Sequence, residues 1–395
     1  MKKTIKLAVV AALALGATSA FATNGSNLIA TGAKARAMGG TDIGIAHGAE
    51  SGLANAALIT TVEGTEISFG GTLFMPDVQT DAGNGAGYKS SDADMSMIPE
   101  VAIASKLSES LYIGVGMWGT AGMGVDYRDE AANMHMVTNL QLMQFGVPIA
   151  YKVKGVSLSV TPVLQYGSLD INYANDAAGT TSTTQGVAQD LEFGYNLGAA
   201  YTIKGITLGA MYKSQIDMEY KGQISQAMSD FTGAPASAFS DKLSTPAEIG
   251  LGLSYTTKEH TIAFDYKQIK WSDAKGYEDF AWDDQDVYAI GYEYAKNNWA
   301  VRLGYNYADS PISEQPAGGG ELINEFNLLG FPAIITSHMT LGGSYTLSKQ
   351  TSVDLAYVYA PEVTETYANT GYSATGEIST KHSQQSVSVQ MNFDF

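Results

Sequence analysis

The sequence predicts an all-β fold, a membrane barrel of about 14 antiparallel strands with an N-terminal hatch of short helical and irregular segments. Three observations support this prediction. From residue 64 onward, short segments alternate apolar and polar residues, as strands with two different faces do. The connections between these segments are alternately short and long. A stretch of small residues, rich in glycine, precedes the first segment and has no core of its own.

The chain begins with the features of a secretory signal peptide. Lys2, Lys3 and Lys6 form a basic region, residues 7–15 are apolar, and residues 20–22 read A-x-A. We therefore expect a signal peptide at residues 1–22 and a place in the bacterial envelope. The leader carries three lysines and no acid, so its removal lowers the formal charge from −18 to −21. Such an acidic chain argues against nucleic acid as a partner.

The composition excludes several kinds of functional site and of membrane protein. The chain has no cysteine, which excludes disulfides, thiolate metal sites and cysteine nucleophiles. After the leader, no apolar run approaches the roughly 18 residues that a membrane-spanning helix needs. A mean hydropathy of −0.05 together with 23 tyrosines fits a barrel, in which apolar residues occupy alternate positions.

The predicted hatch covers residues 23–63 and the predicted barrel residues 64–395. Within the hatch, residues 31–60 hold six glycines among alanines and short polar residues, too interrupted for a long amphipathic helix. Small residues permit close packing inside an enclosure. The charged and titratable side chains suit a polar lumen better than a hydrophobic core; they are Lys34, Arg36, Asp42, His47 and Glu50.

The strands are expected in chain order, separated by tight turns on the periplasmic rim and long loops on the outer rim. The predicted strands are residues 65–74, 97–106, 111–118, 140–153, 156–173, 189–203, 206–220, 244–256, 260–271, 286–294, 299–307, 338–347, 352–359 and 384–395. A soluble β-sandwich is the alternative, but sandwiches do not show such regular loop asymmetry.

The last strand alternates most clearly. Val387, Val389 and Met391 share one face with the terminal Phe395, while serine, glutamine and asparagine occupy the other face. We expect the apolar face to meet lipid. Aromatic residues near strand ends fit interfacial girdles, and we assign these here: Tyr112, Trp118, Tyr151, Tyr220, Trp271, Tyr294 and Trp299.

Several short motifs occur in a specific order along nearly the whole mature chain. They are ARAMGG at residues 35–40, NAALIT at 55–60, YKS at 212–214 with KG at 221–222, NYADSP at 306–311 and FPAI at 331–334. Together with the closing strand, they resemble the FadL/TodX family of outer-membrane channels for long-chain fatty acids and other hydrophobic compounds. The resemblance implies a fourteen-stranded barrel closed by a hatch. Ala56 stands where the family usually has proline. The hatch residues that the resemblance indicates are Arg36, Gly39, Gly40, Asn55, Ala56 and Ala57.

Residues 114–119 match the pattern GxGxxG, but no helix follows and a tryptophan occupies the loop, so a nucleotide site is not expected. Glycines in a strand bend explain the pattern. The family resemblance implies a kink in the third strand that opens a lateral gap in the wall. We place it at Gly116, Met117, Trp118, Gly119, Gly122 and Met123.

Two predicted outer loops are unusually apolar. We expect them to pack together as a lid and to form a hydrophobic groove for a ligand. The groove residues are Ile224, Met228, Phe231, Phe239, Phe326, Leu328, Leu329 and Phe331. The acidic run at residues 278–286 lacks the EF-hand pattern and is expected to be a solvated loop.

The expected function is passive transport of hydrophobic small molecules across the outer membrane, through loop capture and a hatch-gated exit, for which a sideways path through the wall and a path into the periplasm both stay open. A surface adhesin or structural barrel is the alternative; an open porin disagrees with the hatch, and no catalytic or cofactor motif points to an enzyme. The expected partners are outer-membrane lipid, lipopolysaccharide and, during biogenesis, the barrel-assembly machinery. The chain is expected to be a monomer. Long-chain fatty acids and neutral hydrocarbons both stay open as ligands, with Lys34, Arg36 and Arg128 as carboxylate partners.

Overall fold

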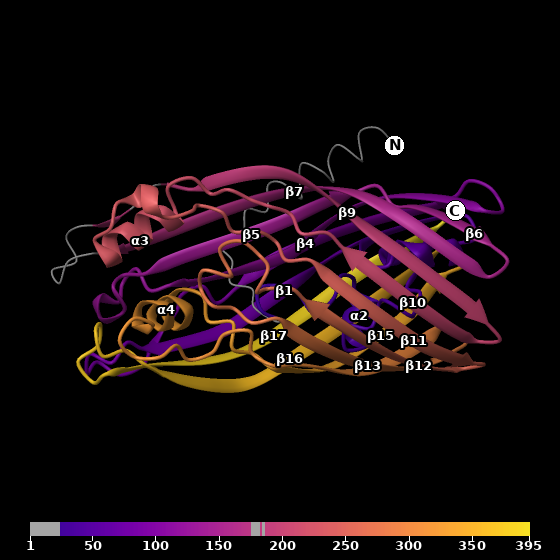
Figure 1. Ribbon diagram of the computed structural model, residues 1–395. Coiled ribbons are helices and arrows are strands. Elements are labelled where there is room, and N and C mark those ends of the chain that lie inside the picture. Colours follow the sequence, from indigo (N-terminus) through magenta and orange to yellow (C-terminus); the bar gives the residue numbers. More distant parts are fainter. Residues whose placement is uncertain (1–23, 175–181, 184–185) are drawn as a thin grey trace.

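The computed structural model describes residues 24–174, 182–183 and 186–395. The predicted signal peptide lies outside these residues. The described part of the chain forms a closed antiparallel barrel, with long loops gathered at one rim and tight turns at the other (Figure 1). The barrel closes where its first strand pairs with its last, from Glu66 opposite Asp394 to Asp81 opposite Ser379.

Seventeen strands lie in the described residues. They are β1 (Thr65–Asp81), β2 (Lys89–Ser90), β3 (Ser96–Lys106), β4 (Leu111–Asp126), β5 (Val137–Gly146), β6 (Ile149–Val153), β7 (Val156–Ala174), β8 (Ser182–Thr183), β9 (Ala188–Ile203), β10 (Ile206–Lys213), β11 (Glu248–Thr257), β12 (His260–Ile269), β13 (Gln285–Lys296), β14 (Trp299–Ala308), β15 (Ser337–Ser348), β16 (Thr351–Ala368) and β17 (Glu377–Asp394). Leaving out the two-residue strands β2 and β8, and counting β5 and β6 as one wall strand, gives the predicted fourteen.

The wall strands show the predicted alternation. Along β17, Ser386, Ser388 and Gln390 are buried in the lumen, while Val387 and Val389 are exposed on the outside, Val389 by 48%. Apolar residues outside and polar residues inside are the reverse of a soluble protein, because the outer face meets lipid. The tight turns favour this geometry: the turn from β6 to β7 is Lys154 and Gly155, both with positive φ, as two-residue hairpins require.

Two predicted strands end differently in the structure. The strand expected at residues 206–220 stops at Lys213, because the chain then leaves β9 and residues 216–219 pair with residues 242–245 of the same loop. The strand expected at residues 140–153 is interrupted at Val147 and Pro148. Proline has no amide hydrogen for the ladder, so it marks the break between β5 and β6.

The assignment of aromatic girdles was wrong for four residues. Tyr112 and Trp118 sit at inward-facing positions of β4 and are buried against the hatch. Tyr220 and Trp271 lie beyond the ends of their strands and are buried among the loops. Only strand positions that face outward can reach the interface, as Tyr151 does with 55% of its surface exposed.

Residues 24–60 are buried or half-buried, and the segment contains three short helical elements: α2 (Ala33–Ala37) and the 3₁₀ turns η1 (Gly48–Leu53) and η2 (Ala56–Thr61). No helix in the described residues has both the length and the apolar character to cross a membrane. The other helical segments belong to the long loops: α3 (Ile224–Thr232), η3 (Ala131–Asn133), η4 (Ala236–Ala238), α4 (Glu321–Glu325) and the π-helical turn η5 (Phe326–Gly330).

Glycine lets the hatch approach the wall. A Cβ atom on Gly44 would lie 2.5 Å from the backbone nitrogen of Leu253, and one on Gly39 would lie 2.6 Å from that of Tyr305. The backbone amides of Asp42 and Ile43 donate to the Asp265 carboxylate at 2.7 and 2.8 Å. The small residues of the hatch therefore serve backbone contact with the wall rather than a core of their own.

Candidate functional site: a strap, an aromatic chamber and a hatch

Residues 24–29, called the strap below, run along the third wall strand. β4 pairs with β3 as far as Trp118, and its register with β5 shifts between Gly119 and Ala121. Just beyond Trp118, the strap forms hydrogen bonds with the β4 backbone. Leu28 N donates to Thr120 O at 3.2 Å, and Gly122 N donates to Ser26 O at 3.0 Å. The irregular part of the wall is thus joined to the N-terminal segment.

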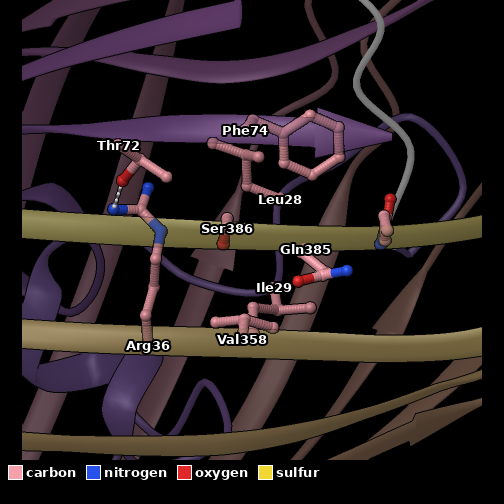
Figure 2. Close-up of a pocket in the computed structure, with 9 residues that line it drawn as sticks. Leu28, Ile29, Arg36, Thr72, Phe74, Val358, Gln385 and Ser386 are labelled. Atoms are coloured by element: carbon pink, nitrogen blue, oxygen red, sulfur yellow. Dashed lines mark hydrogen bonds between the residues drawn. The ribbon is translucent and has the colours of Figure 1, made fainter. Parts of the chain in front are cut away.

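A narrow cavity lies beside Leu28 and Ile29 of the strap (Figure 2). Its volume of about 10 Å³ is the space of a single water molecule. Arg36 reaches it from α2 and donates to the hydroxyl of Thr72 at 2.7 Å and to a Glu100 carboxylate oxygen at 2.8 Å. The buried guanidinium is therefore already neutralised. The other lining residues are Leu28, Ile29, Phe74, Val358, Gln384, Gln385 and Ser386.

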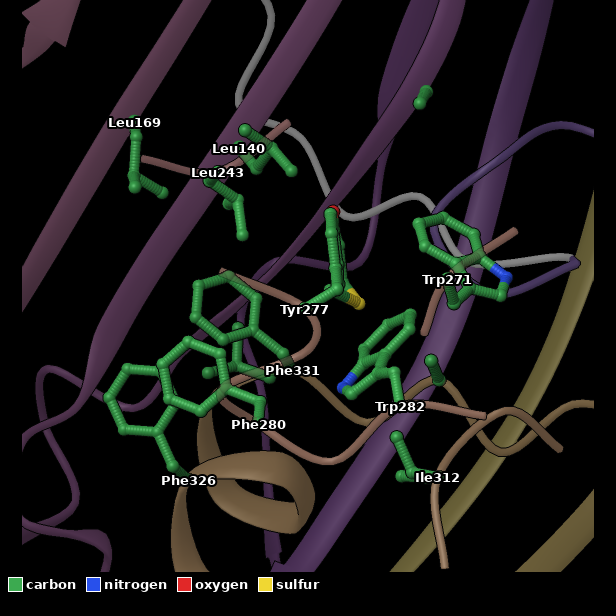
Figure 3. Close-up of a cluster of buried hydrophobic side chains, with 14 of the residues drawn as sticks. Leu140, Leu169, Leu243, Trp271, Tyr277, Phe280, Trp282, Ile312, Phe326 and Phe331 are labelled. Carbon is green, nitrogen blue, oxygen red and sulfur yellow. The ribbon is translucent and has the colours of Figure 1, made fainter. Parts of the chain in front are cut away.

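A second cavity, called the aromatic chamber below, lies under the long loops (Figure 3). Its volume is also about 10 Å³, so the side chains that line it pack closely against one another. Wall strands β4 and β7 supply one side, and three loops supply the rest. Each of its lining residues is uncharged: Met123, Leu169, Ile171, Ile224, Leu243, Tyr277, Phe280, Trp282, Phe326, Asn327 and Phe331.

The rings of the chamber pack in two groups. Tyr277 and Trp282 lie 4.7 Å apart, centroid to centroid, and Trp271 lies beside both. The rings of Phe280 and Phe326 are stacked at 4.8 Å with an interplanar angle of 3°. Each such pair contributes about 0.5–1.5 kcal/mol beyond burial, so a ligand must replace these contacts to enter.

Asn327 joins the loops around the chamber. Its side-chain oxygen accepts from Trp282 Nε1 at 3.1 Å, and its side-chain nitrogen donates to Phe280 O at 3.1 Å. The strap reaches the same place, since Ser26 Oγ and Tyr277 OH are 3.2 Å apart. Outer loops, chamber and strap are therefore one connected set of contacts.

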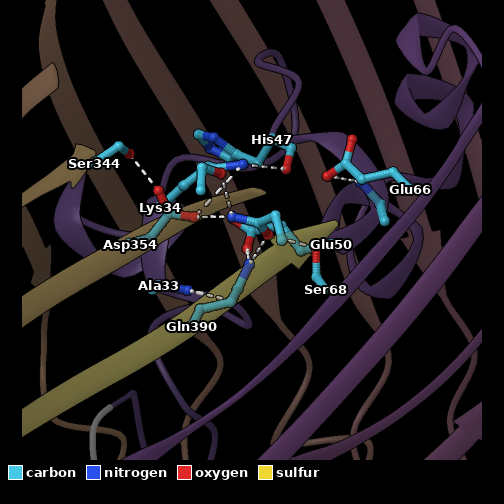
Figure 4. Close-up of polar contacts among 12 residues, drawn as sticks. Ala33, Lys34, His47, Glu50, Glu66, Ser68, Ser344, Asp354 and Gln390 are labelled. Atoms are coloured by element: carbon cyan, nitrogen blue, oxygen red, sulfur yellow. Dashed lines mark hydrogen bonds and ion pairs between the residues drawn. The ribbon is translucent and has the colours of Figure 1, made fainter. Parts of the chain in front are cut away.

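The polar hatch residues are held by the inner faces of the wall strands (Figure 4). Lys34 Nζ lies 3.6 Å from an Asp354 carboxylate oxygen, and Ala33 N donates to Gln390 Oε1 at 3.1 Å. Gln390 also donates to the buried Glu50 carboxylate. These contacts attach α2 and η1 to β16 and β17.

Comparison with known proteins bears on this arrangement. The family model described as outer membrane protein transport protein (OMPP1/FadL/TodX) matches residues 8–395. The chain belongs to the FadL/TodX family. The family resemblance drawn from the motifs is confirmed, and with it the outer-membrane location. Outer-membrane barrels have short turns in the periplasm and long loops outside, so we take the long-loop rim as the outer rim.

Solved FadL/TodX structures share the fold. The Pseudomonas putida toluene transporter TodX superposes with a TM-score of 0.68 at 17% identity, over 93% of this chain and 99% of that one. A Pseudomonas aeruginosa FadL homologue gives 0.70 at 14% identity, over 94% and 100%. The Ralstonia pickettii toluene transporter TbuX gives 0.67 at 17% identity, over 93% and 99%. The fourteen-stranded barrel is thus confirmed.

A curated relative matches one part of the chain. It is an uncharacterized protein in the 5′ region of the phosphoenolpyruvate carboxykinase gene of Chlorobium limicola, 43% identical over 83 residues. The match spans 20% of this chain and 41% of the relative's length.

Most of the predicted groove residues meet in the FadL/TodX barrel at the aromatic chamber. Ile224, Phe326 and Phe331 line it, Leu328 and Leu329 are buried in the same cluster, and Met228 and Phe231 pack against that cluster half-buried. Phe239 is half-buried outside the cluster. The two apolar loops therefore do pack together as a lid.

Sequence reasoning missed the third loop of the lid. Phe280 and Trp282 lie within the acidic run that was expected to be solvated, and Tyr277 directly precedes it; all three are buried, which corrects that expectation. The acids do face outward, with Asp284 bonded to Lys270 at 2.7 Å. The spacing of aromatic residues between those acids was the available signal.

The predicted carboxylate partners lie in three different places. Lys34 is paired with Asp354 and Arg36 with Glu100, both inside the barrel. The Arg128 side chain is 62% exposed near the outer rim, where it is paired with Asp126.

The remaining predicted residues lie along the hatch and the third strand. Among the hatch residues, Gly39 and Gly40 follow α2, and Ala56 and Ala57 begin η2. Asn55 precedes η2 and donates to Ala199 O at 3.1 Å. The kink residues Gly116, Met117, Trp118, Gly119, Gly122 and Met123 bracket the register shift of β4.

Proposed function

We propose that this chain passes neutral hydrophobic small molecules, aromatic hydrocarbons above all, inward across the outer membrane. The observation that carries the proposal is the uncharged lining of the aromatic chamber. A fatty-acid carboxylate in such a site would need a cation beside it, or would favour its protonated form. Arg36, which lines the narrow cavity beside the strap, already serves Glu100. Solved structures named as toluene transporters support the same class of ligand.

The route begins at the outer loops. A hydrocarbon meets the half-buried Met228 and Phe231, displaces the rings of the aromatic chamber, and continues along the strap toward the hatch. Methionine and aromatic side chains suit this step because they adapt to ligands of different shape. The last step is movement of the strap away from β4, which frees the irregular wall near Gly119 for a sideways exit.

Uptake by whole cells tests the proposal. In a host that lacks other channels for hydrophobic compounds, the chain should accelerate entry of radiolabelled p-xylene. Leu243→Asp places a charge in the chamber and should reduce uptake at least about tenfold, because burying an unpaired carboxylate is costly. Leu243→Met keeps the apolar volume and is the matched control. Equal uptake by all three proteins, at equal surface levels, would contradict the proposal.

A further inference from the structure

Three polar side chains lie close together in the lumen on the wall strands β14, β15 and β17. Asn306 of β14 pairs in register with His338 of β15, and Gln384 of β17 pairs with Ala360 of β16. Ala360, the small residue of β16 at this level, is itself fully buried. Asn306, His338 and Gln384 are all at least 98% buried and share the inward face of their strands. These three residues are called the polar row below.

The polar row carries hydrogen-bonding atoms that the described residues leave without a partner. They are Asn306 Oδ1, His338 Nδ1 and Gln384 Oε1. His382, one inward position further along β17 toward the outer rim, adds Nε2 to this set. Buried polar groups in proteins are almost always satisfied, so the three atoms of the row and the nearby His382 nitrogen are places where a guest molecule can bond.

The bonds that these residues do make fix what the guest must offer. Gln384 donates from its amide nitrogen to His338 Nε2 at 2.8 Å, so His338 carries its proton on Nδ1. His382 Nδ1 donates to Pro332 O at 2.9 Å, which leaves Nε2 as an acceptor. Asn306 donates to Gly39 O at 3.0 Å, which leaves Oδ1 as an acceptor. The row and His382 together present three acceptors and one donor.

The position of the row connects the two cavities. On the outer side, His382 is bonded to the loop that carries Phe331 into the aromatic chamber. On the hatch side, Asn306 is bonded to Gly39, and Gln384 lines the narrow cavity beside Leu28. A molecule that leaves the chamber toward the hatch therefore meets the row.

We propose that the polar row, with His382, is a second binding subsite that takes the hydroxyl group of a neutral hydrophobic alcohol or phenol. A hydroxyl donates to Gln384 Oε1, Asn306 Oδ1 or His382 Nε2 and accepts from His338 Nδ1–H. The apolar body of the guest then extends toward the rings of the aromatic chamber, which must part to admit it, because the narrow cavity has the space of only one water molecule. An ionised carboxylate is disfavoured, because it can accept from His338 Nδ1–H but offers no donor to any of the three acceptors.

This inference rests on the proposed function, since it specifies the ligands that pass the same route. A pair of ligands of equal shape separates the two claims. Titration calorimetry of the purified, detergent-solubilised chain measures p-cresol and p-xylene, which differ only in a hydroxyl and a methyl group. For each variant, the ratio of the p-cresol and p-xylene dissociation constants is calculated. This ratio is then compared between variants.

Gln384→Leu combined with Asn306→Leu should weaken p-cresol binding about tenfold, the loss of one to two hydrogen bonds, and change p-xylene binding less than about twofold. Gln350→Leu is the matched control, because Gln350 is exposed in the turn between β15 and β16 and lines neither cavity. It should leave both constants unchanged.

An unchanged ratio in the double variant would overturn the subsite while leaving the proposed function intact. Binding of p-cresol without p-xylene would overturn the hydrocarbon chamber and support the row, and binding of neither would overturn both. Crystals of the unaltered chain soaked with 4-bromophenol give an answer independent of folding defects. The bromine anomalous peak should lie one ring length from His338 and Gln384; a peak elsewhere would contradict the subsite.

Discussion

Trp282 donates its indole N–H to the side-chain oxygen of Asn327 at 3.1 Å, which joins two outer loops whose residues are 45 positions apart. The side-chain nitrogen of Asn327 also donates a hydrogen bond to Phe280 O. One side chain therefore fixes both loops over the aromatic chamber.

Replacing Asn327 by leucine should loosen the lid. The change leaves two buried groups unpaired, each at a cost of about 1–3 kcal/mol, while the barrel strands keep their ladders. We expect faster hydrogen exchange at residues 277–283 and the same heat-modifiable gel mobility. Asn84→Leu, at an exposed outer loop, is the control and should change neither. Unaltered exchange in Asn327→Leu would show that ring packing alone holds the loops.

Replacing Arg36 by glutamine should release the hatch. Glu100 is 96% buried, and losing its partner costs about 3–5 kcal/mol. Ion conductance in planar bilayers should rise, and adding Glu100→Gln should lower it again by removing the unpaired charge. Lys89→Gln breaks the partly exposed ion pair with Glu130 and should have no effect. Conductance that stays low in Arg36→Gln would mean that the hatch contacts of Gly39 and Asp265 suffice.

Replacing Gly44 by alanine should displace the hatch from the wall. Its Cβ would lie 2.5 Å from the Leu253 backbone nitrogen, and backbone cannot yield as a side chain can. We expect a lower melting temperature of the solubilised barrel. Gly371→Ala is the control, because its Cβ meets nothing within 4 Å. Equal melting temperatures would place the hatch further from β11 than we find it.

The lid should become less stable as pH rises from about 4.5 to about 7. Burial raises the pKa of Glu325 from 4.5 to about 7, so the closed lid holds a proton that the open loop releases. A raised carboxyl pKa stabilises the closed form below the ordinary pKa, and about 3 kcal/mol of this is lost by pH 7.

Glu325→Gln should abolish that dependence, because glutamine still accepts from Asn369 but cannot ionise. Protease protection of residues 321–330 across this range is the measurement. Glu362→Gln, at an exposed position of β16, is the control and should keep the parent profile. A parent chain with flat protection would contradict the role of Glu325.

Strand periodicity and loop asymmetry predicted the barrel because both are local properties of the chain. Val387 and Val389 lie outward and Ser386 inward, as expected from alternation. The wall strand that ends at Lys213 was overextended because its loop continues in extended conformation and pairs with itself.

The candidate site was predictable only in part. Ile224 and Phe326 stood out as apolar residues in outer loops, whereas Tyr277 and Trp282 were hidden among acids whose side chains face outward. Asn306, His338 and Gln384 look like any polar inward position of a barrel strand. Their significance comes from register between strands far apart in sequence, which periodicity does not contain.

Competition between 1-decanol and decanoate tests the central claim, that the route is built for neutral ligands. Displacement of bound radiolabelled p-xylene from the purified chain is followed between pH 5 and pH 8. We expect decanol to compete equally at every pH and decanoate to compete progressively less as it ionises. Tighter competition by ionised decanoate, lost in Arg128→Gln or in the Arg36→Gln, Glu100→Gln double variant, would contradict the account.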